Sequence, residues 1–225
     1  MNKLANVVLE RLLEHYDIKK KEFLNNYSTP FQLLVAALLS AQSTDKQVNT
    51  VTNQLFKRYP DPQSFAQSSP EEIEQYIKSV GLYKTKARNI HNLSKVLLSE
   101  YNSSVPKTIS ELIKLPGIGR KTANVVLNDW FQINEGIAVD THVQRISYRI
   151  GLTKHTNPEK IEKDLMLLFP KNSWGILTRL FISHGREICL ARNPKCDNCF
   201  LSDICKKNII RKNKSSKREK NNITK

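Results

Sequence analysis

The chain has 225 residues, and its 36 lysines and arginines against 21 aspartates and glutamates give a formal net charge of +15 at pH 7. This excess is larger than solubility requires, so it predicts a polyanionic partner. The charge is unevenly distributed: residues 206–225 hold nine basic side chains and one acidic one, a net +8. The first 205 residues therefore keep +7, and we expect the remaining 20 to form a basic, disordered tail.

Length and hydropathy exclude several further classes of protein. A chain of this size can bury a core and form one or two domains. Its longest mostly apolar stretch, residues 31–41, is about half of the ~20 residues that span a bilayer. The N-terminus lacks the apolar segment of a signal peptide. We therefore expect a cytoplasmic protein with no membrane span, in which four cysteines favour metal or redox chemistry over disulfides.

Helical periodicity runs through the chain from its beginning. Apolar residues recur at steps of three and four, which is the period of an amphipathic helix. These include Leu4, Val7, Val8 and Leu12, and later Val48, Val51 and Leu55. Residues 31–41 are apolar nearly all round, which is typical of a helix at the centre of a bundle. The sequence has no Asn-Gly or Asp-Gly pair to signal a β-hairpin.

Residues that favour helix starts and helix ends also indicate a helical fold. Capping side chains are followed by proline, glycine or acidic residues at the positions that helix ends prefer. Helices are expected to begin after Ser69 and end before Gly81, to run from Asp140 to Gly151, and to begin after Asn157 and end before Pro170. We expect roughly ten helices and no strand, which makes the fold class all-α.

A hairpin with two glycines is the first candidate site. Residues 115–123 read Leu-Pro-Gly-Ile-Gly-Arg-Lys-Thr-Ala, with amphipathic segments on both sides. Gly117 and Gly119 are expected to allow backbone angles and close approach that a β-carbon would block. The N-terminus of the following helix, with Arg120 beside it, would then bind a phosphate without reading sequence. The alternative is an ordinary helix–turn–helix corner with a glycine cap.

Lys121 and Asp140 are the candidate catalytic residues. The positive helix end and the neighbouring Arg120 disfavour the charged form of the Lys121 amine, and a deprotonated amine is what a Schiff-base nucleophile requires. Asp140 follows a short apolar run and opens a helix, so its simplest role is that of an N-cap. A capping carboxylate can also act as an acid or base, or stabilise positive charge on a sugar.

These residues, together with Val-Asp-Thr-His-Val at 139–143, resemble the helix-hairpin-helix DNA glycosylase superfamily and, within it, the endonuclease III family. The similarity covers about residues 1–205 and includes residues 38–45 and 81–83. It implies that Lys121 is the nucleophile and Asp140 the essential carboxylate. Under the same resemblance, the side chains that enter or face the duplex are Gln42, Leu82 and His142.

Each of those three residues also has a simpler interpretation. Gln42 suits a polar helix end, Leu82 a core position just after a glycine, and His142 a surface position on the first turn of its helix. The presence of Lys121 favours lyase activity, because the resemblance implies that monofunctional relatives lack this lysine.

The four cysteines lie together, at Cys189, Cys196, Cys199 and Cys205. Four close thiolates indicate either Zn²⁺ or an iron–sulfur cluster, and ligand type alone does not choose between them. The resemblance implies a [4Fe–4S] cluster with a structural role. Closing the loop between the first two cysteines would then present Arg192 and Lys195 to DNA phosphates.

The resemblance also implies two helical domains with the active-site cleft between them. These are a bundle with the hairpin at 22–132, and a second domain from 1–21 and 133–205 that ends in the cluster loop. We expect a monomeric glycosylase and abasic-site lyase that acts on double-stranded DNA with oxidised pyrimidines or abasic sites, associated with the nucleoid.

Three other functions are weighed against this one. The first is an adenine-removing glycosylase, whose additional C-terminal domain would not fit in this length. The second is a non-catalytic helix-hairpin-helix DNA-binding protein with a metal-stabilised loop, and the third is a cluster-based redox sensor.

Overall fold

The computed structural model describes residues 2–17 and 24–207. Within these ranges the chain has eleven α-helices, two short 3-10 helices and no strand, which confirms the all-α fold class. No helix in the described part is long and apolar enough to cross a membrane. The chain divides into unit 1, drawn from residues 1–19 and 136–225, and unit 2, residues 20–135. Residues 208–225, most of the predicted basic tail, lie outside the described ranges.

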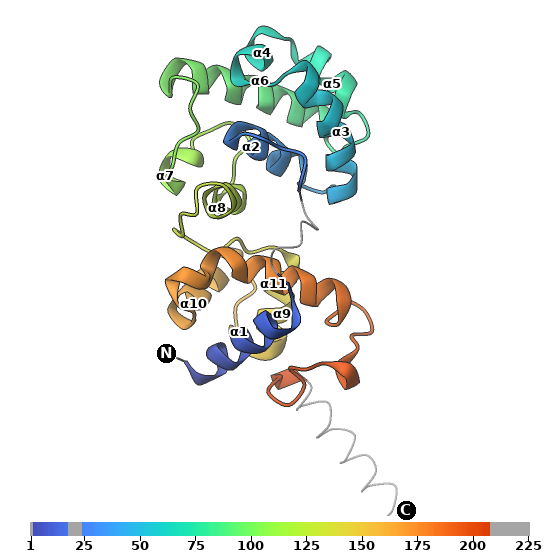
Figure 1. The fold of residues 1–225 in the computed structure, drawn as a ribbon, viewed down its shortest axis with the longest axis vertical. Helices are drawn as coiled ribbons and strands as arrows, with labels where there is room; N and C mark the ends of the chain where they lie inside the picture. Colours follow the sequence, from blue (N-terminus) through green and yellow to red (C-terminus); the bar gives the residue numbers. More distant parts are fainter. Residues whose placement is uncertain (1, 18–23, 208–225) are drawn as a thin grey trace, which may run out of the picture. The chain divides into compact units, whose positions relative to one another are not determined.

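Unit 2 holds seven of the helices (Figure 1). They are α2 (Pro30–Leu39), α3 (Asp45–Arg58), α4 (Pro62–Gln67), α5 (Pro70–Ile77), α6 (Tyr83–Glu100), α7 (Ile109–Leu112) and α8 (Arg120–Asp129). The long α6 packs against α4 and α5, while α2 packs against α3, α6 and α8. This arrangement places α2 at the centre of the unit.

The apolar sequence of α2 accounts for that central place. Every side chain from Phe31 to Leu39 is buried, so the prediction of a fully buried helix is confirmed. Thr29 caps its start by accepting a hydrogen bond from the Gln32 N–H. The helix ends two residues earlier than the apolar run, because Ser40 is its C-cap and Ala41 is exposed in a turn.

Unit 1 combines the N-terminal helix with the C-terminal part of the chain. Its helices are α1 (Lys3–His15), α9 (Thr141–Ile150), α10 (Pro158–Leu168), η1 (Lys171–Ser173), α11 (Trp174–Glu187) and η2 (Cys196–Asn198). Ala5, Val8 and Leu12 place one face of α1 in the core of this unit, where α1 packs on α11 (Figure 1). The first residues of the chain therefore help to build the unit that carries the cysteines.

The predicted start signals are confirmed. Ser69, Asp140 and Asn157 cap α5, α9 and α10, and each side chain accepts a backbone N–H from the first turn. The predicted stop at Gly151 is also confirmed, since this residue is the C-cap of α9 with φ +98°. Glycine suits this position because the left-handed region carries no Cβ penalty for it.

Replacing Leu93 by alanine should destabilise unit 2. Leu93 is completely buried in its core, and Leu→Ala at such a site costs about 2–5 kcal/mol of unfolding free energy. The chain has two tryptophans; Trp130 packs on the core of unit 2 and Trp174 on that of unit 1. Urea unfolding followed by Trp130 fluorescence in a Trp174→Phe background measures the loss, and a change below about 1 kcal/mol would contradict complete burial.

Candidate active site and cluster loop

The predicted hairpin is present between α7 and α8. Gly117 has φ +76°, and a Cβ there would lie 2.6 Å from the side-chain nitrogen of Asn89, so this position requires glycine. For Gly119 the prediction of a special backbone angle is wrong. Its φ is −95°, an ordinary value, and a Cβ would meet nothing within 4 Å. The open space at Gly119 instead leaves room for an approaching group at the start of α8.

The start of α8 brings together an uncapped helix end and two cations. Gly119 is the N-cap and offers no side-chain acceptor to the first-turn N–H groups. Arg120 and Lys121 are the first two residues of the helix, and both are exposed. The side chain of Lys121 makes no hydrogen bond or ion pair with any residue that the structure describes. Its amine is therefore open to a bound ligand.

Asp140 is held at the start of α9 by the predicted capping bonds. One carboxylate oxygen, Oδ1, accepts the backbone N–H of His142 at 2.9 Å and that of Val143 at 2.8 Å. The side chain is half-buried. Both bonds use the same oxygen, so Oδ2 has no hydrogen bond from the described part of the chain. The N-cap role is thus compatible with chemistry at the second oxygen.

His142 is more tightly held than a surface residue of a first turn. Its Nδ1 lies 3.1 Å from Nη2 of Arg145, which donates to it. A Cβ on Gly185 of α11 would lie only 2.3 Å from the same nitrogen, so glycine there makes room for the imidazole. The half-buried ring is fixed on the first turn of α9, two residues from Asp140.

The structure brings Gln42 and Leu82 to neighbouring turns of unit 2. Both have left-handed backbones, with φ of +55° and +59°, which is uncommon for residues other than glycine. A Cβ on Gly81 would lie 3.2 Å from the carbonyl oxygen of Gln42, so the two turns are in close contact. Leu82 is 59% exposed, and the interpretation of this leucine as a core residue is therefore wrong.

All four cysteines line one pocket of unit 1. Apolar side chains such as Ile146 and Leu201 complete the wall of this pocket. Each thiol is half-buried. Burial raises the pKa of the Cys199 thiol to about 11, and the charges of the other three cysteines add to the shift. Four thiolates can share this pocket only with a compensating positive centre.

The donor set fits an iron–sulfur cluster. Among the described residues, no three His, Cys, Asp or Glu side chains are grouped so that they could hold a metal ion. The four thiols line one pocket whose lining has no carboxylate, and the imidazole of His184 lies beside them. Four cysteine thiolates that converge on one pocket are a ligand set that such a cluster uses.

Comparisons with known proteins agree with this geometry. Residues 35–171 match the model of the HhH-GPD superfamily of base excision DNA repair proteins, and residues 189–205 match the iron–sulfur binding domain of endonuclease III. The chain is 49% identical to endonuclease III of Synechocystis over 180 residues, which are 80% of this chain and 82% of that protein. It is 40% identical to endonuclease III of Escherichia coli over 206 residues, 91% and 96% of the two chains.

The chain belongs to the endonuclease III family. It is a DNA glycosylase and abasic-site lyase of base excision repair, and its cofactor is a [4Fe–4S] cluster. A solved structure of a trapped endonuclease III–DNA covalent intermediate has the same fold, with a TM-score of 0.86 and 41% identity. The match covers 94% of this chain and 99% of that one.

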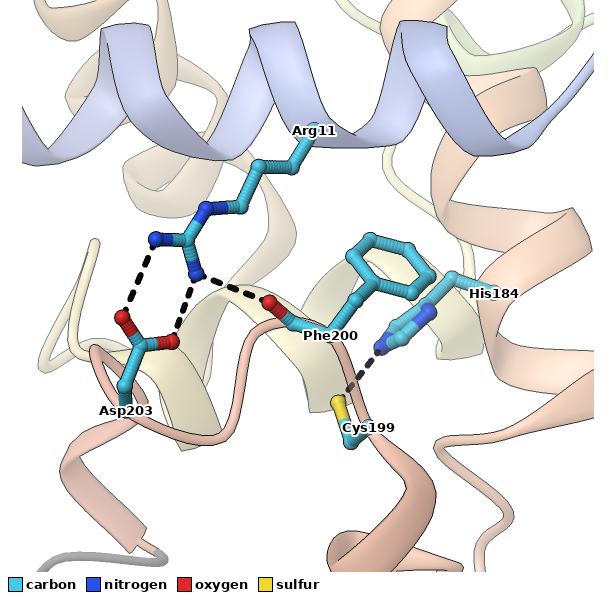
Figure 2. Close-up of polar contacts among 5 residues, drawn as sticks. All are labelled: Arg11, His184, Cys199, Phe200 and Asp203. Carbon is cyan, nitrogen blue, oxygen red and sulfur yellow. Dashed lines mark hydrogen bonds and ion pairs between the residues drawn. The ribbon is translucent and has the colours of Figure 1, made fainter.

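Sequence reasoning missed the residues that surround the cluster loop of this endonuclease III family member. Arg149 of α9 lies 3.4 Å from the Cys189 sulfur through Nη1, which also donates to the Leu190 carbonyl at 2.7 Å. His184 of α11 is buried, and burial lowers its pKa to about 4, so its imidazole is neutral. Its Nε2 lies 3.7 Å from the Cys199 sulfur (Figure 2). Neither residue carries a spacing signal that links it to the cysteines.

The N-terminal helix is also tied to the cluster loop. Arg11 forms two hydrogen bonds with the carboxylate of Asp203, and its Nη1 donates to the Phe200 carbonyl at 2.8 Å (Figure 2). The bond to Arg11 lowers the pKa of Asp203. Both partners lie between Cys199 and Cys205. Arg11 therefore restrains the segment that joins the last two cysteines.

Replacing Arg11 by alanine should make the cluster easier to lose. The variant keeps the four cysteines but removes the contact between α1 and the segment 199–205, so that segment should open more often. The visible absorbance of the purified protein should then decay faster than that of wild type in the presence of an iron chelator. Arg88→Ala, which removes an exposed arginine from unit 2, is the matched control, and equal decay in the two variants would contradict the role of Arg11.

Proposed function

We propose that the chain removes oxidised pyrimidines from double-stranded DNA, with Lys121 as nucleophile and Asp140 as the essential carboxylate. The observation that carries this proposal is the exposed amine of Lys121 at the uncapped start of α8, in a chain of the endonuclease III family. The covalent intermediate described for a related endonuclease III is consistent with a nucleophile of this kind. Lys121 lies in unit 2 and Asp140 in unit 1, and we propose that both act on the same nucleotide.

The proposed reaction begins with extrusion of the damaged nucleotide, which costs a few kcal/mol of lost stacking. The neutral amine of Lys121 attacks the sugar C1′; a C1′–N bond forms while the glycosidic bond breaks and the base leaves with its electron pair and takes up a proton. Opening of the sugar ring gives a Schiff base. Loss of a proton from C2′ then drives cleavage of the C3′–O bond, which nicks the strand by β-elimination.

Asp140 has two tasks in this scheme. Its Oδ1 is held by two backbone N–H groups of α9, which fixes the carboxylate. Oδ2 would accept the proton of the Lys121 ammonium and stabilise the positive charge that develops on the sugar. A rigid carboxylate costs little reorganisation during the reaction.

The proposed DNA contacts divide by chemistry. The N-terminus of α8, reached through Gly117, Gly119 and Arg120, would hold a backbone phosphate. Arg192 and Lys195 are exposed on the loop between the first two cysteines and would reach further phosphates. Gln42 and Leu82 would fill the space left by the extruded nucleotide, and His142 would face the DNA near the pocket.

The remaining proposals concern the cluster, the assembly and the location. We assign all four cysteines as ligands, Cys189, Cys196, Cys199 and Cys205. The cluster would supply folding energy to its loop and take no part in the reaction at the sugar. We propose that the protein acts as a monomer in the cytoplasm, at the nucleoid, through its affinity for DNA.

A non-catalytic helix-hairpin-helix DNA-binding protein with a metal-stabilised loop is the alternative. It would account for the hairpin and the basic charge, but it has no use for an exposed lysine without a partner on α8. Covalent trapping on damaged DNA separates the two functions, because a binding protein forms no Schiff base.

Lys121→Gln should abolish both base excision and strand nicking. The amide of glutamine is polar and uncharged and cannot form a Schiff base, so the rate should fall by a factor on the order of 10³ or more. Borohydride trapping on a duplex with an oxidised pyrimidine should give a covalent adduct with wild type and with Lys95→Gln, an exposed lysine of α6. An adduct that survives Lys121→Gln unchanged would refute the assignment.

Deleting residues 207–225 should reduce the salt dependence of DNA binding. Each lost lysine or arginine that neutralised a phosphate lowers the slope of log K against log[salt] by about 0.9. Excision at low salt should survive, since the residues proposed for catalysis lie outside the deleted segment. Binding titrations of the deletion variant and wild type at several salt concentrations measure the slope, and loss of excision would show that the tail belongs to the site.

A further inference from the structure

Lys86 is a buried lysine that the proposed chemistry does not use. It lies in the second turn of α6, and only 5% of its surface is exposed. The described residues place no carboxylate within ion-pair distance of it. Burial lowers the pKa of its ammonium group. A lysine is rarely buried in this way without partners, so its contacts indicate what it does.

The ammonium group binds the chain on both sides of Gln42. Its Nζ donates to the carbonyl oxygens of Leu39, at 2.8 Å, and Ala41, at 2.5 Å, and lies 3.4 Å from the hydroxyl oxygen of Ser43. Three acceptors match the three donors of an ammonium group. Leu39 is the last residue of α2, so the cation also lies at the negative end of that helix.

The same residue is joined to the turn that carries Leu82. The Lys86 backbone N–H donates to the Leu82 carbonyl at 3.0 Å, the first hydrogen bond of α6. The turn before α6 also touches the Gln42 turn directly, through the close approach of Gly81 to the Gln42 carbonyl. Lys86 therefore holds one turn through its side chain and the other through its backbone.

Both turns have a conformation that needs support. Gln42 and Leu82 are in the left-handed region, where a residue with a Cβ is disfavoured. Such conformations persist when the surrounding structure fixes them. Both side chains are exposed, so contacts of their own with the core do not hold them in place. Lys86 makes hydrogen bonds to both of these turns.

We propose that Lys86 is a positioning residue for base extrusion, whose ammonium group fixes the two turns so that Gln42 and Leu82 project into the duplex together. The inference rests on the proposed entry of these two side chains into DNA. Lys86 itself does not touch DNA or the reacting sugar. By binding both turns, it makes them one rigid unit that carries Gln42 and Leu82, which we call the wedge.

A purely structural role makes a different prediction. If Lys86 only stabilised unit 2, any core variant with the same loss of unfolding free energy would reduce extrusion of the nucleotide by the same amount. If it positions the wedge, extrusion should fail in a protein that is still folded and still binds undamaged DNA. The comparison therefore needs a core variant of the same helix, and Leu93→Ala provides it.

The experiment uses the full chain and a duplex with 2-aminopurine opposite an oxidised pyrimidine. Fluorescence of 2-aminopurine rises when its base is unstacked, so it reports insertion of the wedge independently of chemistry. Lys86→Met and the milder Lys86→Gln are compared with wild type, Leu93→Ala, Gln42→Ala and Leu82→Ala. Each variant is measured at a temperature at which its tryptophan fluorescence shows it folded.

We expect Lys86→Met and Lys86→Gln to lose most of the fluorescence rise. Excision should slow by about tenfold to a hundredfold, as when a supporting group lets a reacting geometry shift by about 1 Å. Affinity for undamaged duplex should stay within about twofold, because no phosphate contact changes. Leu93→Ala should keep the wild-type fluorescence rise.

Two outcomes overturn the inference, and they differ. If Leu82→Ala and Gln42→Ala both leave the fluorescence rise intact, the proposed entry of these side chains into DNA is wrong and the role of Lys86 falls with it. If those two variants lose the rise but the folded Lys86 variants keep it, or if Leu93→Ala loses as much as they do, only the role of Lys86 is wrong.

Discussion

The backbone groups at helix ends are the constraint on which this structure depends. The first four N–H groups of an α-helix have no acceptor within it, and in eight of the eleven described α-helices an N-cap side chain supplies one. The exceptions are α6, α8 and α11. Helix α11 continues directly from η1, whereas the N-caps of α6 and α8 are Leu82 and Gly119, two of the residues proposed to meet DNA. Helix starts with no internal acceptor are therefore concentrated where an external one is expected.

Features set by neighbouring residues could be predicted from the sequence, whereas features set by tertiary contacts could not. The caps at Ser69, Asp140 and Asn157 depend on residues a few positions apart, so local patterns were sufficient to find them. The buried α2 was predicted because its apolar run is continuous. The close contact between the Gln42 and Leu82 turns was not predictable, since no local pattern reports that 40 residues of chain return to the same place. For the same reason Lys86, which joins them, looked like one of many surface lysines.

The role of each lysine or arginine depends on how deeply its side chain is buried and on what it contacts, more than on how many such residues the chain has. Lys121 is exposed at a helix start, which suits a nucleophile that must reach a ligand. Lys86 is buried against three oxygen acceptors, which suits a fixed support. Arg11 is bound to a carboxylate and a carbonyl of the cluster loop. The net charge of +15 predicts a polyanionic partner, but it does not distinguish a catalytic cation from a structural one, because that difference lies in tertiary contacts.

The cluster loop shows why a metal centre is placed in unit 1. Between Cys189 and Cys205 the chain has one short 3-10 helix, and Leu201 is the only fully buried apolar side chain of that stretch. So little buried apolar surface cannot offset the conformational entropy of seventeen ordered residues. Arg11, Arg149 and His184 bind the loop from α1, α9 and α11, but each acts on a cysteine or on the segment beside one. Bonds from iron to four thiolates would supply the missing free energy at those same positions. The protein contacts and the cluster would therefore stabilise one another, and together they would fix the loop that carries Arg192 and Lys195.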